Sequence, residues 1–340
     1  MSTNRQRLRK RKKRIKRRRI MFFIILPMML LAFTAAGYGA FLYKKAETIF
    51  SASYQDDGRA KSDLRDGEVD PEIDNVSILL IGVDDSDTRQ FGGKTRSDAL
   101  MLATLNEKKK TIKLLSIPRD SYVYVPEMGE KTKITHAHAY GGPRATIETV
   151  ENLLDIPVDY YVRMNFNAFM DVVDAIGGIK VDVPYELSEM DSKDRNEAIH
   201  LKPGVQKLDG EEALALARTR KLDNDIERGK RQQEIMKAVV KKAISVNSIS
   251  KYDKIVEAIG SNMKTNMTFN EMKAFISYGT TGKLKIQTLN LQGKDGRDPN
   301  SNAYIYELDE TELEVTERQL KRHLEISYAN RDEDQDLASK

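Results

Sequence analysis

Residues 76–118 read VSILLIGVDDSDTRQFGGKTRSDALMLATLNEKKKTIKLLSIP, in which three apolar runs alternate with polar segments. The runs 76–84, 99–106 and 111–118 are almost continuously apolar, which is typical of strands that are buried on both faces of a sheet. The polar segment NEKKK joins the last two runs and predicts a hairpin connection. We therefore expect a sheet that other elements cover on both sides.

Helical patterns alternate with further strands along the rest of the chain. Pro143 predicts the first turn of a helix over 143–154, and glycines end a second predicted helix over 167–178. We expect further strands at 158–165, 179–184 and 283–291, and further helices at 209–218, 225–244, 250–261 and 269–279. Interleaved strands and helices favour an α/β fold, a three-layer α/β/α sandwich with a central mixed sheet.

An uncharged segment precedes this domain. Residues 20–43 contain no charged residue, and 24 residues of helix reach about 36 Å, enough to cross a hydrocarbon core of about 30 Å. Residues 1–19 contain twelve Lys and Arg and no acid. The positive-inside rule then predicts one transmembrane helix with a cytoplasmic N-terminus in the cell membrane. A cleaved signal peptide is the alternative, but the segment is longer than a usual signal core.

Charge and composition limit the remaining function classes. The net charge of +4 includes the twelve basic residues of the first nineteen, so residues 20–340 carry a net charge of −8 and we expect no nucleic-acid partner. Cysteine is absent, which excludes disulfides and thiolate metal sites. The predicted organisation is a basic cytoplasmic tail (1–19), a transmembrane helix (20–43), a polar stalk (44–74), an extracytoplasmic domain (75–328) and a disordered tail (329–340).

Two aspartates stand beside the first two strands. Asp84 ends the first apolar run, and Arg96 and Asp98 precede the second, two residues apart and therefore on one side of an extended chain. If these strands are neighbours, the carboxylates of Asp84 and Asp98 meet and form a hard oxygen site suited to Mg²⁺, with Mn²⁺ as an alternative. The competing interpretation is a pair of loop acids that Arg96 neutralises.

Arginines recur at the ends of the predicted elements. Arg119 follows the third strand, and Arg218 and Arg220 leave a helix two residues apart. On the next helix Arg228, Arg231 and Gln232 share one face. A solvated basic face is the alternative, since acidic residues lie nearby. Arginine forks bind phosphate with two parallel hydrogen bonds, so the set as a whole suits a pyrophosphate held beside a metal ion.

The motifs TRSDALMLATLN, KLLSIPRDSYV, KITHAHAYGGP, VDAIGGIKVDVP, KLDGEEALALARTR and the final D-x-x-R-x-x-R-Q occur in this order over residues 76–245. In this the chain resembles the LytR–CpsA–Psr family. The resemblance implies a magnesium-dependent phosphotransferase that moves an anionic glycopolymer, such as wall teichoic acid, from a polyprenyl-pyrophosphate carrier to the C6 hydroxyl of N-acetylmuramic acid in peptidoglycan.

The resemblance also implies residue roles. The metal ligands would be Asp84 and Asp98, and the catalytic residues Arg119, Asp84 and Arg96. The pyrophosphate-binding set would be Arg96, Arg119, Lys133, Arg218, Arg220, Arg228 and Gln232. A long apolar pocket for the lipid is implied as well. The apolar faces of 147–154, 166–176 and 235–244 are candidates for its lining, and ordinary core packing is the alternative for each.

Two other functions use the same sequence features. A pyrophosphatase would need the same residues with water as the acceptor. A non-catalytic membrane regulator would act through the basic tail, but gives the arginines and aspartates of the outer domain no role. The identity of the transferred glycopolymer, the general base and the oligomeric state do not follow from the sequence.

Overall fold

The structure of the protein is a computed structural model, which describes residues 13, 16, 20–84, 95–193, 195–219, 225–245, 252–260, 262–280 and 284–326. It forms two compact units, residues 1–48 and 49–340. The basic tail (1–19), apart from Lys13 and Lys16, and the predicted disordered tail (329–340) lie outside the described residues, as does Arg220.

The second unit is built on a six-stranded mixed sheet with the strand order β11-β6-β1-β2-β3-β12. The strands β1, β2 and β3 form an antiparallel meander, whereas β6 is parallel to β1 and β12 is parallel to β3. Their bounds are β1 Val76–Val83, β2 Ser97–Asn106, β3 Thr111–Ser116, β6 Tyr160–Asn165, β11 Met263–Thr265 and β12 Lys285–Asn290. The three strands and the hairpin that the opening stretch predicts are therefore confirmed.

The apolar side chains of β1 divide between the two faces of the sheet. Leu79, Ile81 and Val83 enter one core, whereas Ile78 and Leu80 pack into the other. This alternation follows from the two-residue period of a strand. A strand that is apolar at every position therefore requires a cover on each face, which is why the chain forms three layers.

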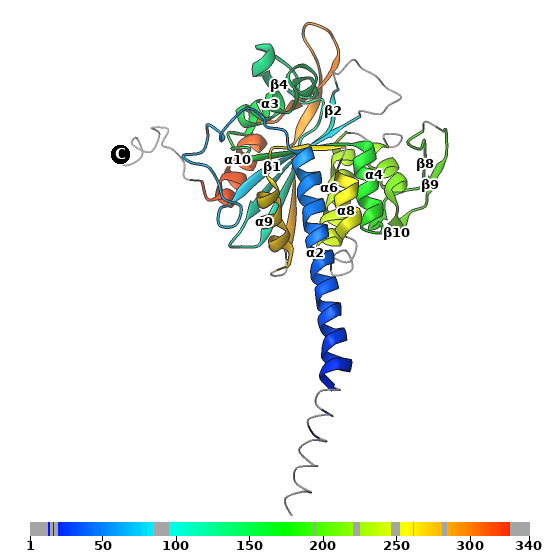
Figure 1. Ribbon diagram of the computed structural model, residues 1–340. Coiled ribbons are helices and arrows are strands. Elements are labelled where there is room, and N and C mark those ends of the chain that lie inside the picture. The colour runs from blue at the N-terminus through cyan, green and yellow to red at the C-terminus, as the bar shows by residue number, and fades with distance from the viewer. Residues whose placement is uncertain are drawn as a thin grey trace, which may run out of the picture. The chain divides into compact units, whose positions relative to one another are not determined.

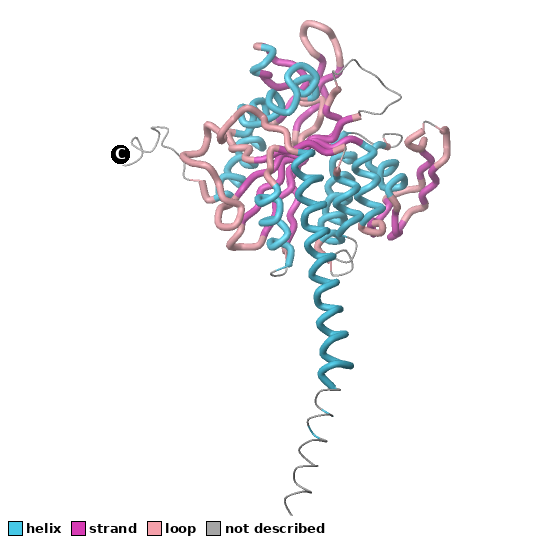
Figure 2. The backbone as a smooth tube through the Cα atoms, viewed as in Figure 1, coloured by secondary structure: helices cyan, strands magenta, loops and turns pink. Residues whose placement is uncertain are grey.

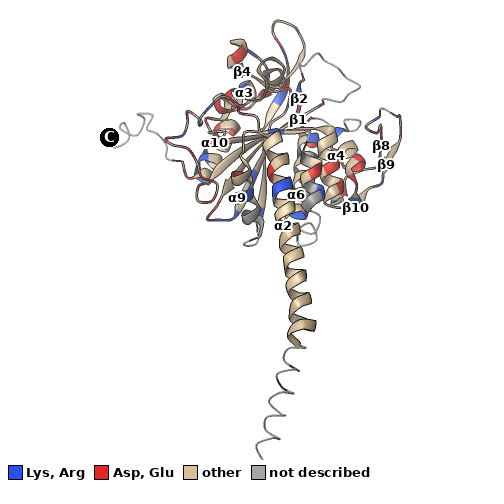
Figure 3. Cartoon of the chain, in the orientation of Figure 1, with Lys and Arg blue, Asp and Glu red and all other residues tan. Residues whose placement is uncertain are grey.

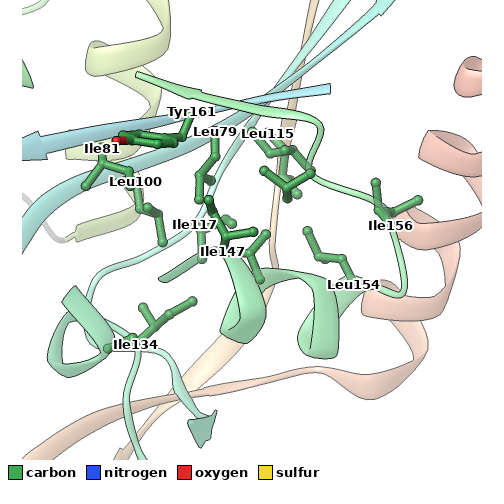
Figure 4. Packing of buried hydrophobic residues seen from close by; sticks show 14 of the residues in the cluster. Leu79, Ile81, Leu100, Leu115, Ile117, Ile134, Ile147, Leu154, Ile156 and Tyr161 are labelled. Carbon is green, nitrogen blue, oxygen red and sulfur yellow. The ribbon is translucent and has the colours of Figure 1, made fainter. Parts of the chain in front are cut away.

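Helices lie on both sides of the sheet (Figures 1 and 2). On one face α3 (Thr135–Leu154) and α10 (Glu310–Leu324) pack on the first core, which Figure 4 shows from close by with Leu79, Ile147 and Leu154 among its labelled residues. On the other face Met236 and Val240 of α6 (Asp225–Ala243) and Phe275 of α9 (Phe269–Thr280) cover the sheet. The predicted three-layer α/β/α fold is confirmed.

A smaller core lies beside the sheet. It joins α4 (Phe166–Ala175), α5 (Gly210–Arg218) and α6 to two antiparallel pairs of strands. These are β7 (Ile179–Val183) with β10 (Gly204–Leu208), and β8 (Leu187–Glu189) with β9 (Ile199–Leu201). The remaining elements are β4 (Tyr122–Val125), η2 (Pro126–Met128), β5 (Glu130–Lys133), α8 (Tyr252–Ile259), β13 (Gly293–Arg297) and β14 (Tyr304–Leu308).

Helix α3 begins earlier than expected. The prediction placed its start at Pro143, but helical residues extend from Thr135 across a break at Gly142, which has φ +66° and ψ −152°. A positive φ is accessible to glycine at little cost, so Gly142 bends the chain between two helical segments. A Cβ at Gly141 would lie 2.4 Å from the Cβ of Ala145, so this position also requires glycine.

The segment before the domain differs from the predicted stalk over 44–74. A helical stretch, η1 (Met21–Ile25) followed by α2 (Leu26–Ser53), extends beyond the predicted span 20–43, and it is long and apolar enough to cross a membrane (Figure 3). Residues 54–74 are part of the folded domain, because Arg65 forms an ion pair with Asp159 (2.6 Å) and Arg59 forms one with Glu151 (2.9 Å). Polar composition suggested a free linker, but these charges are paired within the domain.

Candidate functional site

A cavity of about 340 Å³ lies between the sheet and helices α4, α5 and α6. Its apolar lining comes from the middle of the strands and from these helices, and includes Leu80, Met101, Phe169 and Met236. Its polar lining is Asp84, Asp98, Arg119, Arg218, Arg228 and Gln232, together with Asn165. The cavity therefore combines an apolar interior with charged groups from the ends of the strands and helices.

The strand pairing brings the two aspartates together. In the antiparallel ladder of β1 and β2, Val83 lies opposite Ser97, and an irregularity follows Gly82. Asp84 directly follows β1, Asp98 is the unpaired residue of β2 between Ser97 and Ala99, and both line the cavity. The predicted metal site required the first two strands to be neighbours, and β1 and β2 are paired directly.

Small residues keep the adjoining part of the cavity open. Gly82 and Ala99 are direct partners in the ladder, and both line the cavity. A Cβ added at Gly82 would lie 3.1 Å from the Cβ of Ala99, a tighter contact than packed side chains usually make. Neither position has room for a larger side chain without loss of cavity space.

Arg119 connects the aspartates to a second group of charges. Its guanidinium contacts the carboxylate of Asp98, and its Nε lies 3.6 Å from Asp120. Asp120 is 6% exposed and accepts a 2.7 Å bond from the Nζ of Lys133. Burial opposes its ionisation, but the hydrogen bonds with Lys133 and with Asp225 and the charge of Arg119 outweigh burial and lower the pKa of Asp120. Asp120 is thus a buried anion that holds two cations of the site in place.

The end of α5 brings Arg218 to the cavity. The side chain of Asp209 caps the first turn of α5 and its partner Glu212 completes a capping box, so the helix has a defined start. Arg218 ends the helix, and its guanidinium carbon lies 4.9 Å from the centre of the Phe166 ring. The ring thus holds the guanidinium at the cavity, where its N–H groups can reach a ligand.

Helix α6 supplies Arg228 and Gln232, one turn apart. Arg228 is 5% exposed and pairs with Asp225 at 2.8 Å. The amide of Gln232 donates a 3.2 Å hydrogen bond to the carbonyl of Ala217. Both side chains line the cavity, so the helical spacing in the sequence correctly predicted that they lie at one place.

The sequence pattern places Arg231 on the same helix face as Arg228 and Gln232, but its side chain does not reach the cavity. It is buried, and it donates hydrogen bonds to the carbonyls of Leu216 (3.2 Å) and Thr219 (2.6 Å). It is not part of the cavity lining. Its contacts satisfy the last carbonyls of α5, so Arg231 fixes the segment that carries Arg218.

Two further residues of the predicted set lie beside the cavity rather than in its lining. Lys133 is held by Asp120, and Arg96 is exposed just before β2. Burial is the main cause that lowers the pKa of His136, and the positive charges of Arg96 and Lys133 lower it further. These two cations therefore lie near His136. Lys133 and Arg119 thus share Asp120 as a partner, and Arg119 also lines the cavity. Arg96 lies near Lys133.

The sequence left open whether segments 147–154, 166–176 and 235–244 line a pocket or pack in the core, and the cavity lining decides this for each. Phe166 and Phe169 of α4 and Ile235 and Met236 of α6 line the cavity. Residues 147–154 do not, because α3 covers the opposite face of the sheet and packs in the first core. The expectation for 147–154 is corrected to ordinary core packing.

The donor set at the strand ends fits a hard divalent cation. Asp84 and Asp98 offer carboxylate oxygens, and Mg²⁺ is commonly held by one or two carboxylates plus phosphate oxygens and water. Over the described ranges, no cluster of three or more His, Asp or Glu is close enough to hold a metal ion alone. An ion held by these two carboxylates would take its remaining ligands from water and from phosphate oxygens.

Asp120 is the site residue that sequence reasoning missed. A signal was present, since Asp120 directly follows Arg119 at the end of a predicted strand. The pattern did not show that residues 120 and 133 would meet across the β4–β5 hairpin, in which Tyr122 lies directly opposite Lys133.

Comparisons with known proteins agree with this geometry. The sequence model of the LytR_cpsA_psr family matches residues 40–322. The polyisoprenyl-teichoic acid–peptidoglycan teichoic acid transferase TagT of Bacillus subtilis strain 168 is 39% identical over 305 residues, which is 88% of this chain and 92% of TagT. TagV of the same strain is 42% identical over 305 residues, 88% of this chain and 77% of TagV. The solved structure of the B. subtilis family protein YwtF (TagT) with bound octaprenyl pyrophosphate has a TM-score of 0.64 at 37% identity, and the match covers 79% of this chain and 98% of that chain.

Proposed function

The chain belongs to the LytR_cpsA_psr family, and we propose that it is a membrane-anchored transferase that attaches an anionic glycopolymer, such as wall teichoic acid, to peptidoglycan. The donor would be a polyprenyl-pyrophosphate-linked polymer and the acceptor the C6 hydroxyl of N-acetylmuramic acid. One observation carries the proposal: a single cavity combines an apolar interior with three arginines and two carboxylates at its strand and helix ends. Such a site suits a ligand that is part lipid and part pyrophosphate.

Each part of the cavity has a role in this reaction. The apolar lining receives the prenyl chain, and Arg119, Arg218 and Arg228 neutralise the pyrophosphate oxygens. Asp84 and Asp98 are the residues that would hold Mg²⁺, or Mn²⁺ in its place, and the bound ion would supply further neutralisation of phosphate charge. Asp120 keeps Arg119 and Lys133 in position.

The transfer exchanges one bond to phosphorus for another. The acceptor oxygen bonds to the phosphorus that carries the sugar, the P–O bond to the prenyl phosphate breaks, and the hydroxyl proton is released. Because negative charge spreads over the phosphoryl oxygens in such reactions, fixed cations account for most of the catalysis. The arginines that line the cavity support this assignment.

The relation to the membrane is part of the same proposal. The apolar helix before the domain would span the membrane once, with the basic residues 1–19 in the cytoplasm and the catalytic domain outside. A donor with a membrane-embedded carrier and an acceptor in the cell wall both require this orientation.

The test is a transfer assay with the full-length protein. The protein in detergent with Mg²⁺ is mixed with a lipid-linked, radiolabelled teichoic acid precursor and with uncrosslinked peptidoglycan, and the label in peptidoglycan is counted. We expect label in the glycan that is released by muramidase digestion. If the polymer is released from its lipid at the same rate with and without peptidoglycan, and none becomes attached, the protein is a pyrophosphatase instead.

A further inference from the structure

Three tyrosines lie outside the cavity at one end of the domain. On β4, Tyr122 and Tyr124 point to one side while Val123 and Val125 are buried on the other. Tyr124 is 43% exposed. Tyr304 begins β14, whose hairpin with β13 lies beside β4 (orange in Figure 1). We call Tyr122, Tyr124 and Tyr304, with the carboxylates of Asp295 and Asp298, the tyrosine patch.

The tyrosine patch is joined directly to the charged site. The backbone N–H of Tyr306 on β14 donates a 2.8 Å hydrogen bond to the carbonyl of Asp120, and Ser121 forms a bridge with Tyr306. Tyr122 is the direct partner of Lys133 in the β4–β5 ladder. These backbone bonds fix both hairpins against the residues that hold Arg119, so a ligand on the tyrosine patch lies next to the reaction centre.

The side chains of the tyrosine patch combine rings with hydrogen-bond acceptors. The Nζ of Lys133 lies 5.8 Å from the centre of the Tyr304 ring, and the hydroxyl of Tyr304 donates a 2.8 Å bond to Asp295. Burial and the charge of Asp298, which is also a hydrogen-bond partner of Tyr122, raise the pKa of Tyr122. The pKa of Asp298 is lowered mainly by the hydrogen bond from the backbone N–H of Ser301, with a smaller contribution from the charge of Lys133. Asp298 accepts bonds from the N–H groups of Asn300 and Ser301, which hold the loop beside the rings.

This combination matches the chemistry of a neutral sugar. The C–H face of a pyranose ring packs on an aromatic ring, and its hydroxyl groups donate to carboxylates in charge-assisted hydrogen bonds. An anionic polymer is a poorer match, because the carboxylates of Asp295 and Asp298 outnumber the ammonium of Lys133 at the rings. The donor polymer carries a phosphate charge along its length, whereas the backbone of the acceptor is a chain of amino sugars.

We propose that the tyrosine patch binds the glycan strand of the acceptor and delivers its hydroxyl to the phosphate beside Arg119. The proposal rests on the proposed function, since that function supplies a peptidoglycan acceptor. It assigns acceptor recognition to the β4–β5 and β13–β14 hairpins, and donor recognition to the cavity. Both substrates would thus meet beside the Asp120 segment.

The experiment uses the full-length protein and variants that remove a ring or only its hydroxyl. Tyr124→Ala and Tyr304→Ala remove rings, Tyr124→Phe keeps the ring, and Tyr54→Ala is the control for an exposed tyrosine elsewhere (44% exposed). Binding of a soluble, donor-free peptidoglycan oligosaccharide is measured by calorimetry, and transfer is measured over a range of acceptor and donor concentrations. Circular dichroism melting checks that each variant is folded.

Loss of one ring contact should weaken oligosaccharide binding and raise the acceptor KM roughly three- to tenfold, with the donor KM unchanged. Tyr124→Phe and Tyr54→Ala should behave like the parent. Parental acceptor KM and affinity in both alanine variants would overturn the proposal, as would a rise confined to the donor KM, which would indicate that the polymer occupies the patch. Ring-dependent oligosaccharide binding by a parent that transfers no polymer would contradict the proposed function and leave the tyrosine patch standing.

Discussion

Replacement of Arg218 by lysine separates the phosphate-binding role from an ordinary surface charge. Arg218 lines the cavity, and its guanidinium lies over the Phe166 ring at 4.9 Å. Lysine keeps the positive charge and has a stem of similar reach, but it lacks the flat fork that can contact two phosphate oxygens at once. The substitution therefore tests geometry rather than charge.

The structure allows the effects on rate and on folding to be worked out separately. Loss of one charge-assisted contact to the transition state should cost about 2–4 kcal/mol, which is roughly a 30- to 1000-fold loss of kcat/KM. The ring contact contributes only about 0.5–1 kcal/mol, and an ammonium can retain part of it, so the free energy of unfolding should change by less than that amount. A large kinetic loss with nearly parental stability is thus the expected result.

The assay measures transfer of labelled polymer to peptidoglycan, together with chemical unfolding of the same samples. Lys241→Ala, on the C-terminal turn of α6 and outside the cavity lining, is the control for a change in basic charge. If Arg218→Lys keeps its kcat/KM within about threefold of the parent, a difference of roughly 0.7 kcal/mol, Arg218 does not grip the pyrophosphate. A parallel fall in stability would mean that the activity loss reflects misfolding instead.

Three other substitutions have defined outcomes. Asp98→Asn should abolish Mg²⁺-dependent binding of a polyprenyl pyrophosphate in calorimetry while melting stays near parental, and retained Mg²⁺ dependence would remove Asp98 from the metal site. Arg231→Lys should lower the free energy of unfolding by about 1–3 kcal/mol, because the carbonyls of Leu216 and Thr219 lose bonds, and an unchanged urea midpoint would contradict that role. His323 is buried between Thr104 and Thr111, and its pKa is lowered from 6.5 to about 4, mainly by burial. Since the unfolded chain binds the proton more tightly, stability is complete above about pH 6.5 and should fall by about 2 kcal/mol by pH 5. Urea titrations at both pH values should show this loss in the parent and not in His323→Leu.

The sequence predicted the sheet because its strands carry their own pattern. The apolar runs around Leu79, Leu102 and Leu114 have side chains for both faces, so burial on both sides follows from the residues alone. It did not show which helix covers which face. Residues 147–154 and 235–244 have similar apolar stripes, and only the path of the chain places one on the closed core and the other on the cavity.

Several strands and one helix escaped prediction, and the β13–β14 hairpin and helix α10 did so for different reasons. Hairpin β13–β14 contains GKDGR, which lacks alternating apolar residues, and its Gly293 matters only in the fold, where a Cβ would lie 2.2 Å from the carbonyl oxygen of Glu307. Helix α10 could have been found, because Asp309 caps its first turn and Leu320 and Leu324 recur at helical spacing. Contacts between residues that are far apart in the sequence, such as Asp120 and Lys133, can be identified only from the structure.

Part of the volume of the cavity exists because two of its lining residues, Gly82 and Ala99, have almost no side chain. Gly82 and Ala99 face each other across two strands, and the space that ordinary strand residues would fill there is left for a ligand. A sheet usually gains stability by packing large side chains on its surface, and here that gain is given up at one pair of residues. A larger side chain at either position would take space from the cavity close to Asp84 and Asp98. The size of the ligand that fits at this point could therefore change without a new charged residue, through a different pair of small side chains on two neighbouring strands.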